Sequence, residues 1–274
     1  MRKPLSLVIT TFNEEKNISR CLESAKWADE IILIDSFSTD RTIELASKFN
    51  VKIIQREYPG SSRQVEFGIN QTINDWVFVI DADEEISKEL REEIESILTA
   101  KEHSISAFEI PRKVFFLGKW IEHSGWYPDY QLRFFRKDSV SAVHAEVHGF
   151  FRAKTKAAKL QGLLYHYTYH TLYDYLQRIN YYTSLHVSNK FSDPKNKKVR
   201  WYHLVVNPIG AFIRLFFSNR GYKDGFQGFI LALFSSIYTM ALYAKIWEYR
   251  KCKESSRELP PITNLDFQKR RDYR

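Results

Sequence analysis

The first hundred residues of this 274-residue chain alternate between two kinds of segment, and this alternation restricts the fold more than any other feature. Short apolar runs rich in Val and Ile occupy residues 5–10, 30–35, 51–55 and 76–81. Such runs are typical of strands that are buried on both faces of a parallel sheet. Segments with apolar residues at helical spacing lie between them. The order predicts an α/β fold with a doubly wound, mostly parallel, Rossmann-like sheet.

Three segments carry apolar residues at every third or fourth position: residues 13–28, 38–49 and 87–98. This spacing predicts helices. Asn13 is the expected N-cap of the first helix, and the third helix is expected to begin at Ser87. Glu84 and Glu85 precede Ser87, so we expect them to complement the positive N-terminal end of that helix.

Three of the predicted strands end in polar clusters, at residues 10–14, 35–40 and 81–85. In doubly wound sheets, ligands bind beyond the carboxyl ends of the strands. A single polar ending is explained equally well as a helix cap. Three endings on the same edge of one sheet predict a binding site.

The ending Asp81-Ala82-Asp83 places two carboxylates at the predicted sheet edge. Both can converge on one hard divalent cation, Mg²⁺ or Mn²⁺, which is commonly held by one or two carboxylates and substrate phosphates. Such an ion neutralises a diphosphate leaving group. A glycosidase pair fits less well, because glycosidase carboxylates flank the bond that they cleave. A helix cap remains the alternative for this motif taken alone.

The neighbouring strand ends supply groups that suit a nucleoside diphosphate. Asp35 can accept hydrogen bonds from a base or a ribose, and Thr10, Thr11 and Glu14 end the first strand. Arg63 is a candidate phosphate or base contact. A nucleoside diphosphate has a base, a ribose and two phosphates, so this edge offers a group for each part.

These motifs together resemble glycosyltransferase family 2, the inverting nucleotide-sugar transferases of the GT-A fold. Four of them occur in order: Thr-Thr-Phe-Asn-Glu, Asp-Ser-Phe-Ser-Thr-Asp, Arg-Gln before Gly, and Asp-Ala-Asp-Glu. Downstream, "YPDYQLRFFRK", "VHAEVHG" and "GYKDGFQGFILALFSSIYTMALYAKIWEY" are similar to the branch of lipopolysaccharide-core β-1,4-glucosyltransferases. With these segments the resemblance covers nearly the whole chain.

The resemblance implies roles for the residues already singled out. Thr10, Asp35 and Arg63 would hold the nucleoside and the phosphates. Asp81 would contact the ribose or the metal, and Asp83 would bind the metal. The chain departs from many family members where Asp35 is followed by Ser instead of a second Asp, so one acidic charge is missing there.

An inverting transferase needs one general base that deprotonates the acceptor hydroxyl. His144, Glu146 and His148 are the candidates, and the family's usual carboxylate base favours Glu146. The alternative is that Glu146 forms a salt bridge with Arg133 or Arg136. Those two arginines are also candidates for contacting the diphosphate or an acidic acceptor.

His166 and His170 lie in a Tyr-rich stretch whose surroundings look helical. We therefore expect them to serve packing or an interface instead of the site.

The net charge of +8 is concentrated near the C-terminus. Residues 1–194 hold 25 Lys and Arg against 27 Asp and Glu, whereas residues 195–274 hold 16 against 6. This basic excess predicts an anionic partner. It adjoins apolar helices, and no recognition helix or aromatic-studded sheet is apparent, so an anionic membrane surface is favoured over nucleic acid.

Residues 226–244 form a 19-residue stretch without a charged residue. A spanning helix needs about 20 apolar residues, but Gln227, two serines and Thr239 interrupt this one. An interfacial or re-entrant helix is the favoured interpretation. A buried hairpin or oligomer interface is the second, and a transmembrane span is the third.

Four regions follow from these patterns. Residues 1–100 are the expected nucleotide-sugar-binding half, and residues 101–194, rich in aromatic side chains, the acceptor-binding half. Residues 195–250 form the membrane-associating region, and residues 251–274 a mobile basic tail. No signal peptide is visible and only two cysteines occur, so the cytoplasmic face of the membrane is the expected location.

The sequence thus predicts an enzyme that moves a hexose, expected to be glucose from UDP-glucose, onto a lipid-linked saccharide such as lipopolysaccharide core. Two alternatives remain open. One is a polyprenyl-phosphate sugar transferase of the same fold, and the other is a non-catalytic nucleotide-binding membrane scaffold. The oligomeric state is not predicted.

Overall fold

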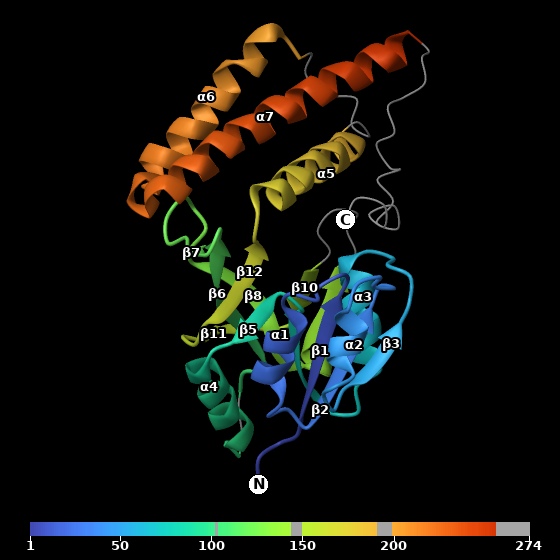
Figure 1. The fold of residues 1–274 in the computed structure, drawn as a ribbon. Helices are drawn as coiled ribbons and strands as arrows, with labels where there is room; N and C mark the ends of the chain where they lie inside the picture. The colour runs from blue at the N-terminus through green and yellow to red at the C-terminus, as the bar shows by residue number, and fades with distance from the viewer. Residues whose placement is uncertain (102–103, 144–149, 191–198, 256–274) are drawn as a thin grey trace. The chain divides into compact units, whose positions relative to one another are not determined.

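The computed structural model describes residues 1–101, 104–143, 150–190 and 199–255 (Figure 1). The chain forms two compact units. The first consists of Met1–Val114 and Pro128–Thr168, and the second of Phe115–Tyr127 and Tyr169–Arg274. The helical unit therefore begins near residue 169, earlier than the residue 195 at which the charge of the sequence changes.

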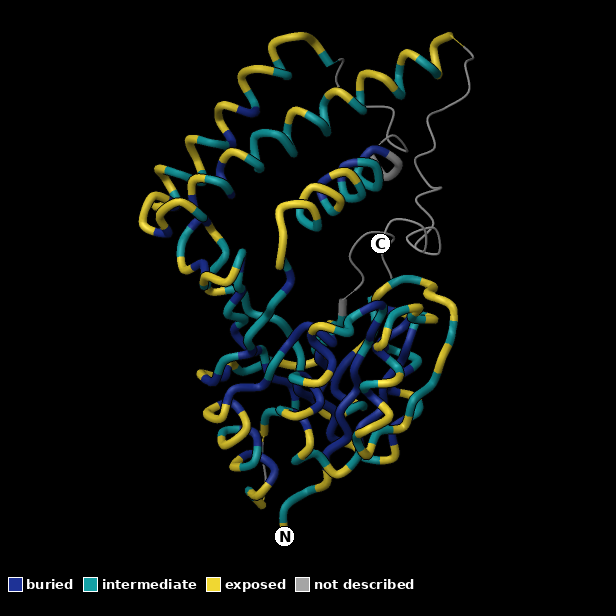
Figure 2. Tube along the Cα trace, viewed as in Figure 1, coloured by how far each residue is buried: buried dark blue, intermediate teal, exposed yellow. Residues whose placement is uncertain are grey.

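Four parallel strands form one half of the sheet in the first unit. Their order is β3 (Lys52–Gln55), β2 (Glu30–Asp35), β1 (Leu5–Thr11) and β4 (Trp76–Asp81). The strands β1, β2 and β4 are buried along almost their whole length, as the apolar runs predict, and Figure 2 shows this buried centre.

The other half of the sheet begins where β8 (Asp129–Arg136) pairs antiparallel with β4. The order continues through β6 (Ala107–Phe116) and β12 (Leu164–Tyr169) to β5 (Glu84–Ile86). Short strands complete the set: β7 (Lys119–Trp120) and β11 (Ala158–Lys159) pair with β6, while β9 (Val140–Val143) and β10 (Phe150–Ala153) pair with each other. The sheet is therefore mixed, and the predicted α/β class is confirmed.

Helices cover both faces of the parallel strands. On one face α1 (Ile18–Ala25) and α4 (Lys88–Thr99) pack against alternate β1 residues such as Leu7 and Ile9. On the other face α3 (Ser61–Asn70) packs against Val8. The helix α2 (Thr42–Ala46) is shorter than the predicted segment. This alternation along β1 makes the sheet doubly wound.

The two predicted helix starts differ in outcome. The third helix begins as predicted at Ser87, which is its N-cap: the Ser87 Oγ accepts a hydrogen bond from the backbone N–H of Leu90 at 3.1 Å. Asn13 is not an N-cap, because α1 begins only at Ile18. Asn13 has a left-handed backbone (φ +53°), and its Oδ1 accepts a hydrogen bond from the backbone N–H of Thr39 at 2.8 Å.

The second unit is mainly helical. Its elements are α5 (Leu172–Lys190), a 3₁₀ turn (Trp201–Leu204), α6 (Val206–Ile213), a π-helical segment (Arg214–Ser218), a second 3₁₀ turn (Gly221–Asp224) and α7 (Gly225–Glu254). Both α5 and α6 pack against α7. By length and composition alone, the segment Gly221–Glu254 is long and apolar enough to cross a membrane, and little of it is buried.

Candidate functional site

The strand register brings the predicted polar endings together at one edge of the sheet. Thr10 lies opposite Asp81, and Thr11 lies opposite Asp35. The Thr10 hydroxyl donates a hydrogen bond to Asp81 Oδ1 at 2.9 Å. Because the three strands are parallel and adjacent, their carboxyl ends form a continuous polar edge.

Hydrogen bonds connect the loop after β1 with the loop after β2. The backbone N–H of Asn13 donates to Ser38 Oγ at 2.9 Å, and that of Glu14 donates to Thr42 Oγ1 at 2.7 Å. The Glu14 carboxylate accepts from Asn17 Nδ2 at 2.8 Å. Glu14 therefore contributes to the shape of this edge through its backbone as well as its carboxylate.

Asp35 is fully buried and holds the loop that follows its strand. Its carboxylate accepts hydrogen bonds from the Ser38 hydroxyl, from the Ser38 backbone N–H at 2.9 Å and from Gln55 Nε2 at 2.8 Å. The hydroxyl of the next residue, Ser36, accepts from Gln64 Nε2 at 3.2 Å. Arg63 lies in the first turn of α3 and is exposed.

Three charged side chains form a cluster at the end of β4, with Glu84 buried, Arg133 largely buried and Asp81 partly exposed. Arg133 Nη2 donates to Asp81 Oδ2 at 2.8 Å and to Glu84 Oε1 at 3.1 Å. The other Glu84 oxygen accepts from the backbone N–H of Asp81 at 2.9 Å. Arg133 thus neutralises two carboxylates at once.

The environment shifts the pKa values of these carboxyl groups in opposite directions. Burial raises the pKa of Glu84 above its ordinary value. Burial also acts to raise the pKa of Asp81, but the charge of Arg133 outweighs it and the pKa of Asp81 is lowered. Asp81 is therefore held as a carboxylate beside a positive charge.

The expected helix-end role of Glu84 and Glu85 is wrong. Glu84 points to Arg133 and, at 3.4 Å, to Arg112. Glu85 accepts a hydrogen bond from the Tyr167 hydroxyl at 2.8 Å. Both carboxylates therefore contact side chains of strands in the antiparallel half of the sheet. The local sequence around Ser87 does not reveal these contacts.

Asp83 is buried, and its Oδ2 lies 3.3 Å from Nε2 of His166. Burial acts to lower the pKa of His166, but the charge of Asp83 outweighs it and raises that pKa. The helical surroundings expected for His166 are wrong, because it lies on strand β12, opposite Glu84 of β5. The period-two alternation of Leu164–Tyr169 could have indicated a strand.

The groups around Asp83 fit a divalent cation. Within the described residues no group of three His, Cys, Asp or Glu side chains could hold a metal ion by itself. Asp83 and His166 offer two donors, and a cation of the Mg²⁺ type takes its remaining ligands from water and substrate phosphates. Asp81 is adjacent, although Thr10 and Arg133 already bind its two oxygens.

The remaining predicted residues lie away from this cluster or outside the described structure. Arg136 lies opposite Trp76, at the start of β4 instead of its end, and pairs with Asp138 at 3.1 Å. The three candidates for the general base, His144, Glu146 and His148, lie outside the described residues.

The sequence reasoning missed Arg112 and Asp129, which face each other across strands β6 and β8. The Asp129 carboxylate accepts from Arg112 Nε at 2.8 Å, and Arg112 also approaches Glu84. These side chains extend the charged network beside Arg133. Only the pairing of the two strands brings them together, so no local motif marks them.

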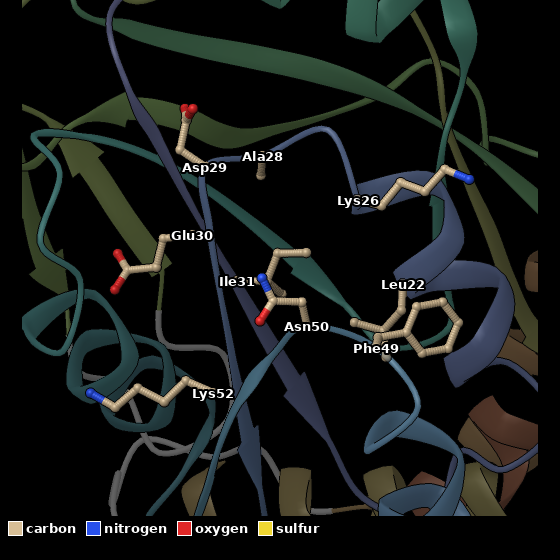
Figure 3. A pocket seen from close by; sticks show the side chains of 9 residues that line it. All are labelled: Leu22, Lys26, Ala28, Asp29, Glu30, Ile31, Phe49, Asn50 and Lys52. Carbon is tan, nitrogen blue, oxygen red and sulfur yellow. The ribbon is translucent and has the colours of Figure 1, made fainter.

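A cavity of about 260 Å³ lies at the opposite edge, at the amino ends of β2 and β3 (Figure 3). Its acidic residues already have partners. Asp29 pairs with Arg2 at 2.7 Å, and the Glu30 carboxylate accepts from the backbone N–H of Ile73 at 2.9 Å. Ligands of doubly wound sheets bind at the carboxyl edge, so this cavity is not the candidate site.

Fold and site together define an α/β protein with a cluster of polar and charged side chains at the carboxyl ends of its parallel strands. The model of the family described as Glycosyl transferase family 2 matches residues 6–159, more than half of the chain. The chain therefore belongs to glycosyltransferase family 2, as the motifs at the strand ends predict. It is a sugar transferase of the GT-A fold.

Two relatives agree with this family, and one solved structure has a similar fold. The lipopolysaccharide core biosynthesis glycosyltransferase LpsC of Rhizobium meliloti is 28% identical, over 91% of this chain and 94% of its own length. A glycosyltransferase of Rickettsia typhi is also 28% identical, over 94% of this chain and 90% of its own. The mannosyltransferase PcManGT from Pyrobaculum calidifontis, solved with GDP-Man and Mn²⁺, has a TM-score of 0.51 at 12% identity and covers 90% of this chain and 87% of its own.

Proposed function

We propose that the protein is an inverting hexosyltransferase that moves glucose from UDP-glucose onto a lipid-linked saccharide such as lipopolysaccharide core. The observation that carries the proposal is the carboxylate pair Asp81 and Asp83 at the end of β4, beside Thr10 and Arg133. The relative LpsC supports a lipopolysaccharide acceptor, and the mannosyltransferase with GDP-Man and Mn²⁺ supports a nucleotide-sugar donor with a divalent cation.

Each side chain at the edge has a distinct role in this proposal. Asp35, Thr10 and Arg63 hold the nucleoside and its phosphates, with Thr11 and Glu14 shaping the same edge. Asp35 does so mainly by fixing the loop after β2, because most of its acceptor capacity is used by Ser38 and Gln55.

Asp83 is the proposed principal ligand of Mg²⁺ or Mn²⁺, with Asp81 beside it and His166 as a further donor. When bound, the ion neutralises the charge of the leaving diphosphate. Arg133 fixes the Asp81 carboxylate in place, so it acts on the site through Asp81 instead of through the diphosphate. Arg136, at the far end of its strand, has no role in the proposed reaction.

The proposed general base is Glu146, with His144 and His148 as the other candidates in the same motif. The base removes the proton of the acceptor hydroxyl as that oxygen attacks the sugar C1. A single carboxylate is sufficient, because an inverting displacement needs only one general base.

The proposed location is the cytoplasmic face of the membrane. The long apolar helix α7 and the basic excess of residues 195–274 support it, since anionic lipids attract Lys and Arg near the surface. A lipid-linked acceptor would be held at the same surface.

Turnover of UDP-glucose by the purified protein tests the proposal. With Mn²⁺ and a core oligosaccharide, we expect UDP release and a β-linked product, as judged by the anomeric coupling in NMR spectra. Asp83→Asn should lower the rate about a hundredfold or more, because the carboxylate that would hold the charge-neutralising cation is lost. Asp138→Asn, an exposed acid far from the edge, is the matched control.

Two results would contradict the proposal. Transfer to polyprenyl phosphate in preference to the oligosaccharide would identify the alternative transferase. Tight UDP binding without turnover of any donor would identify a nucleotide-binding scaffold.

A further inference from the structure

Both α6 and α7 expose apolar stripes at helical spacing. On α6 and the π-helical segment, the stripe consists of Val206, Ile209, Ile213 and Phe217. On α7 it consists of Phe226, Phe229, Leu233, Met240 and Trp247. The apolar stripe of an amphipathic helix ordinarily faces a core. Figure 2 shows the exposed positions recurring along both helices, and a contiguous apolar surface of this kind marks an interaction site.

The turn between the two helices is positively charged. Arg214, Arg220 and Lys223 are exposed there, and none of them forms an ion pair within the part of the chain that the structure describes. Phe226 follows them in the sequence, and 72% of this residue is exposed. We call residues 214–226 the basic turn.

Asp224 is the sole acidic residue of the basic turn, and its charge is directed inward. It is buried, and its carboxylate accepts hydrogen bonds from the backbone N–H of His123 at 3.0 Å and from that of Glu122 at 3.2 Å. The outward surface of the turn is therefore cationic. The Lys119 ammonium donates to the Asp224 carbonyl at 2.7 Å, which anchors the same turn.

Close backbone packing makes the basic turn rigid. A Cβ added to Gly228 would lie 1.9 Å from the Gly221 carbonyl oxygen, so the first turn of α7 touches the preceding 3₁₀ turn directly. Arg220 adopts a left-handed backbone, with φ +57°, between the π-helical segment and that turn. The cations and rings are thus presented in one preformed arrangement.

The contacts of α7 with α5 argue against a transmembrane position for α7. The Lys245 ammonium donates to Asn180 Oδ1 at 2.7 Å and to Thr183 Oγ1 at 2.8 Å. If residues 226–244 of α7 crossed the membrane, Lys245 would lie at the interface, but α5 would lie beside the span, because its His186 contacts the hydroxyl of Tyr238. The polar side chains of α5 would then lie at the level of the bilayer. Such groups are unfavourable in hydrocarbon.

The length of α6 gives a second argument. Its 8 residues and the 5 residues of the π-helical segment extend about 20 Å at 1.5 Å per residue. A bilayer core is about 30 Å thick. Since Ser236 of α7 donates to the Pro208 carbonyl of α6 at 2.7 Å, the two helices stay together. Because α6 with the π-helical segment is too short to cross the bilayer core, the pair of helices cannot form a hairpin that spans it.

We propose that the basic turn docks on the surface of an anionic phospholipid bilayer, with its rings among the acyl chains and α7 lying along the interface. This proposal rests on the membrane location proposed above and specifies which residues make the contact. A second copy of the chain suits this surface less well, because pairing would bring the cations of two turns together. Nucleic acid would leave the apolar stripes uncovered.

Flotation of the full-length protein with vesicles tests the contact. We expect binding to vesicles of phosphatidylglycerol and phosphatidylcholine, and weak binding to phosphatidylcholine alone. Phe226→Glu should reduce binding to the anionic vesicles about tenfold or more, and Lys223→Gln about fivefold, the factor expected for one cation near an anionic surface. The matched control is Ile73→Glu, a similarly exposed apolar residue (81%) in the first unit, which should bind normally.

Thiol labelling tests the orientation of α7. Lys223→Cys places a thiol near its start, and the native Cys252 lies near its end. In sealed, inverted membrane vesicles, a membrane-impermeant maleimide should reach both from the same side. Cys21 is buried, which raises the pKa of its thiol and keeps it unreactive, and Cys252→Ser provides the background.

Three results would overturn the proposal. The first is labelling of the two positions from opposite sides of the membrane. The second is equal binding to neutral and anionic vesicles. The third is that Phe226→Glu loses self-association, measured by sedimentation equilibrium, and keeps its lipid binding. Transfer to a soluble oligosaccharide acceptor should persist in all of these variants. Its absence from the unmodified protein would count against the proposed function, not against the membrane contact.

Discussion

Arg133 is the positive charge that the two carboxylates Asp81 and Glu84 share. Its guanidinium contacts Asp81 and Glu84, and Glu84 in turn binds the backbone N–H of Asp81. Removing one partner of a buried ion pair leaves an uncompensated charge, which is far more unfavourable than losing an exposed pair. The two carboxylates at this edge thus share one cation, supplied by a strand in the other half of the sheet.

This dependence predicts the effect of Arg133→Met. We expect the free energy of unfolding in urea to fall by about 3–5 kcal/mol, because two carboxylates lose their cation. The matched variant Arg136→Met removes a more exposed arginine paired with Asp138, so it should cost about 0–1 kcal/mol. Equal losses in the two variants would show that Arg133 has no special electrostatic role.

At the level of elements, helix α3 depends on a close approach to the sheet. A Cβ at Gly68 would lie 2.5 Å from Val8 Cγ1 and 3.1 Å from Ile34 Cγ1. The first turn of the same helix carries Arg63 and Gln64, so the packing at Gly68 also determines where these polar groups stand relative to Ser36.

A matched pair of glycine substitutions tests this packing. Gly68→Ala should lower the free energy of unfolding by about 1–3 kcal/mol, because the added methyl group overpacks the interface with Val8. Gly210→Ala, in α6, meets no atom within 4 Å and should raise stability by about 0.5–1 kcal/mol through helix propensity. Destabilisation by both substitutions, in thermal or urea unfolding, would contradict the steric explanation for Gly68.

For the whole molecule, the proposed ligand provides a test that does not require turnover. At UDP concentrations of about 100 times Kd with Mn²⁺, binding should stabilise the folded protein by about 2.7 kcal/mol. This corresponds to a Tm increase of about 5–10 °C for a protein of this size. EDTA and Asp83→Asn should each abolish most of the shift. An undiminished shift in EDTA would exclude a cation-dependent nucleotide site.

Much of the secondary structure could be predicted from the sequence. The runs that became β1, β2 and β4 are apolar at most positions on both faces, which is typical of strands buried between two layers of helices. Ser87 was identifiable as an N-cap because capping depends on residues three positions apart. The N-cap prediction for Asn13 was wrong because its side chain accepts a hydrogen bond from a loop that lies 26 residues further along the chain.

The sequence by itself determined that Thr10, Asp35, Asp81 and Asp83 gather at one sheet edge, because parallel strands align their carboxyl ends whatever their partners are. Only the tertiary structure decided which charges meet there. Arg133 reaches Asp81 across 52 residues, and Glu84, on strand β5, points to the same arginine and not to the start of α4. Such pairings depend on the register of β8 and β12, where a shift of one residue would point every side chain to the other face.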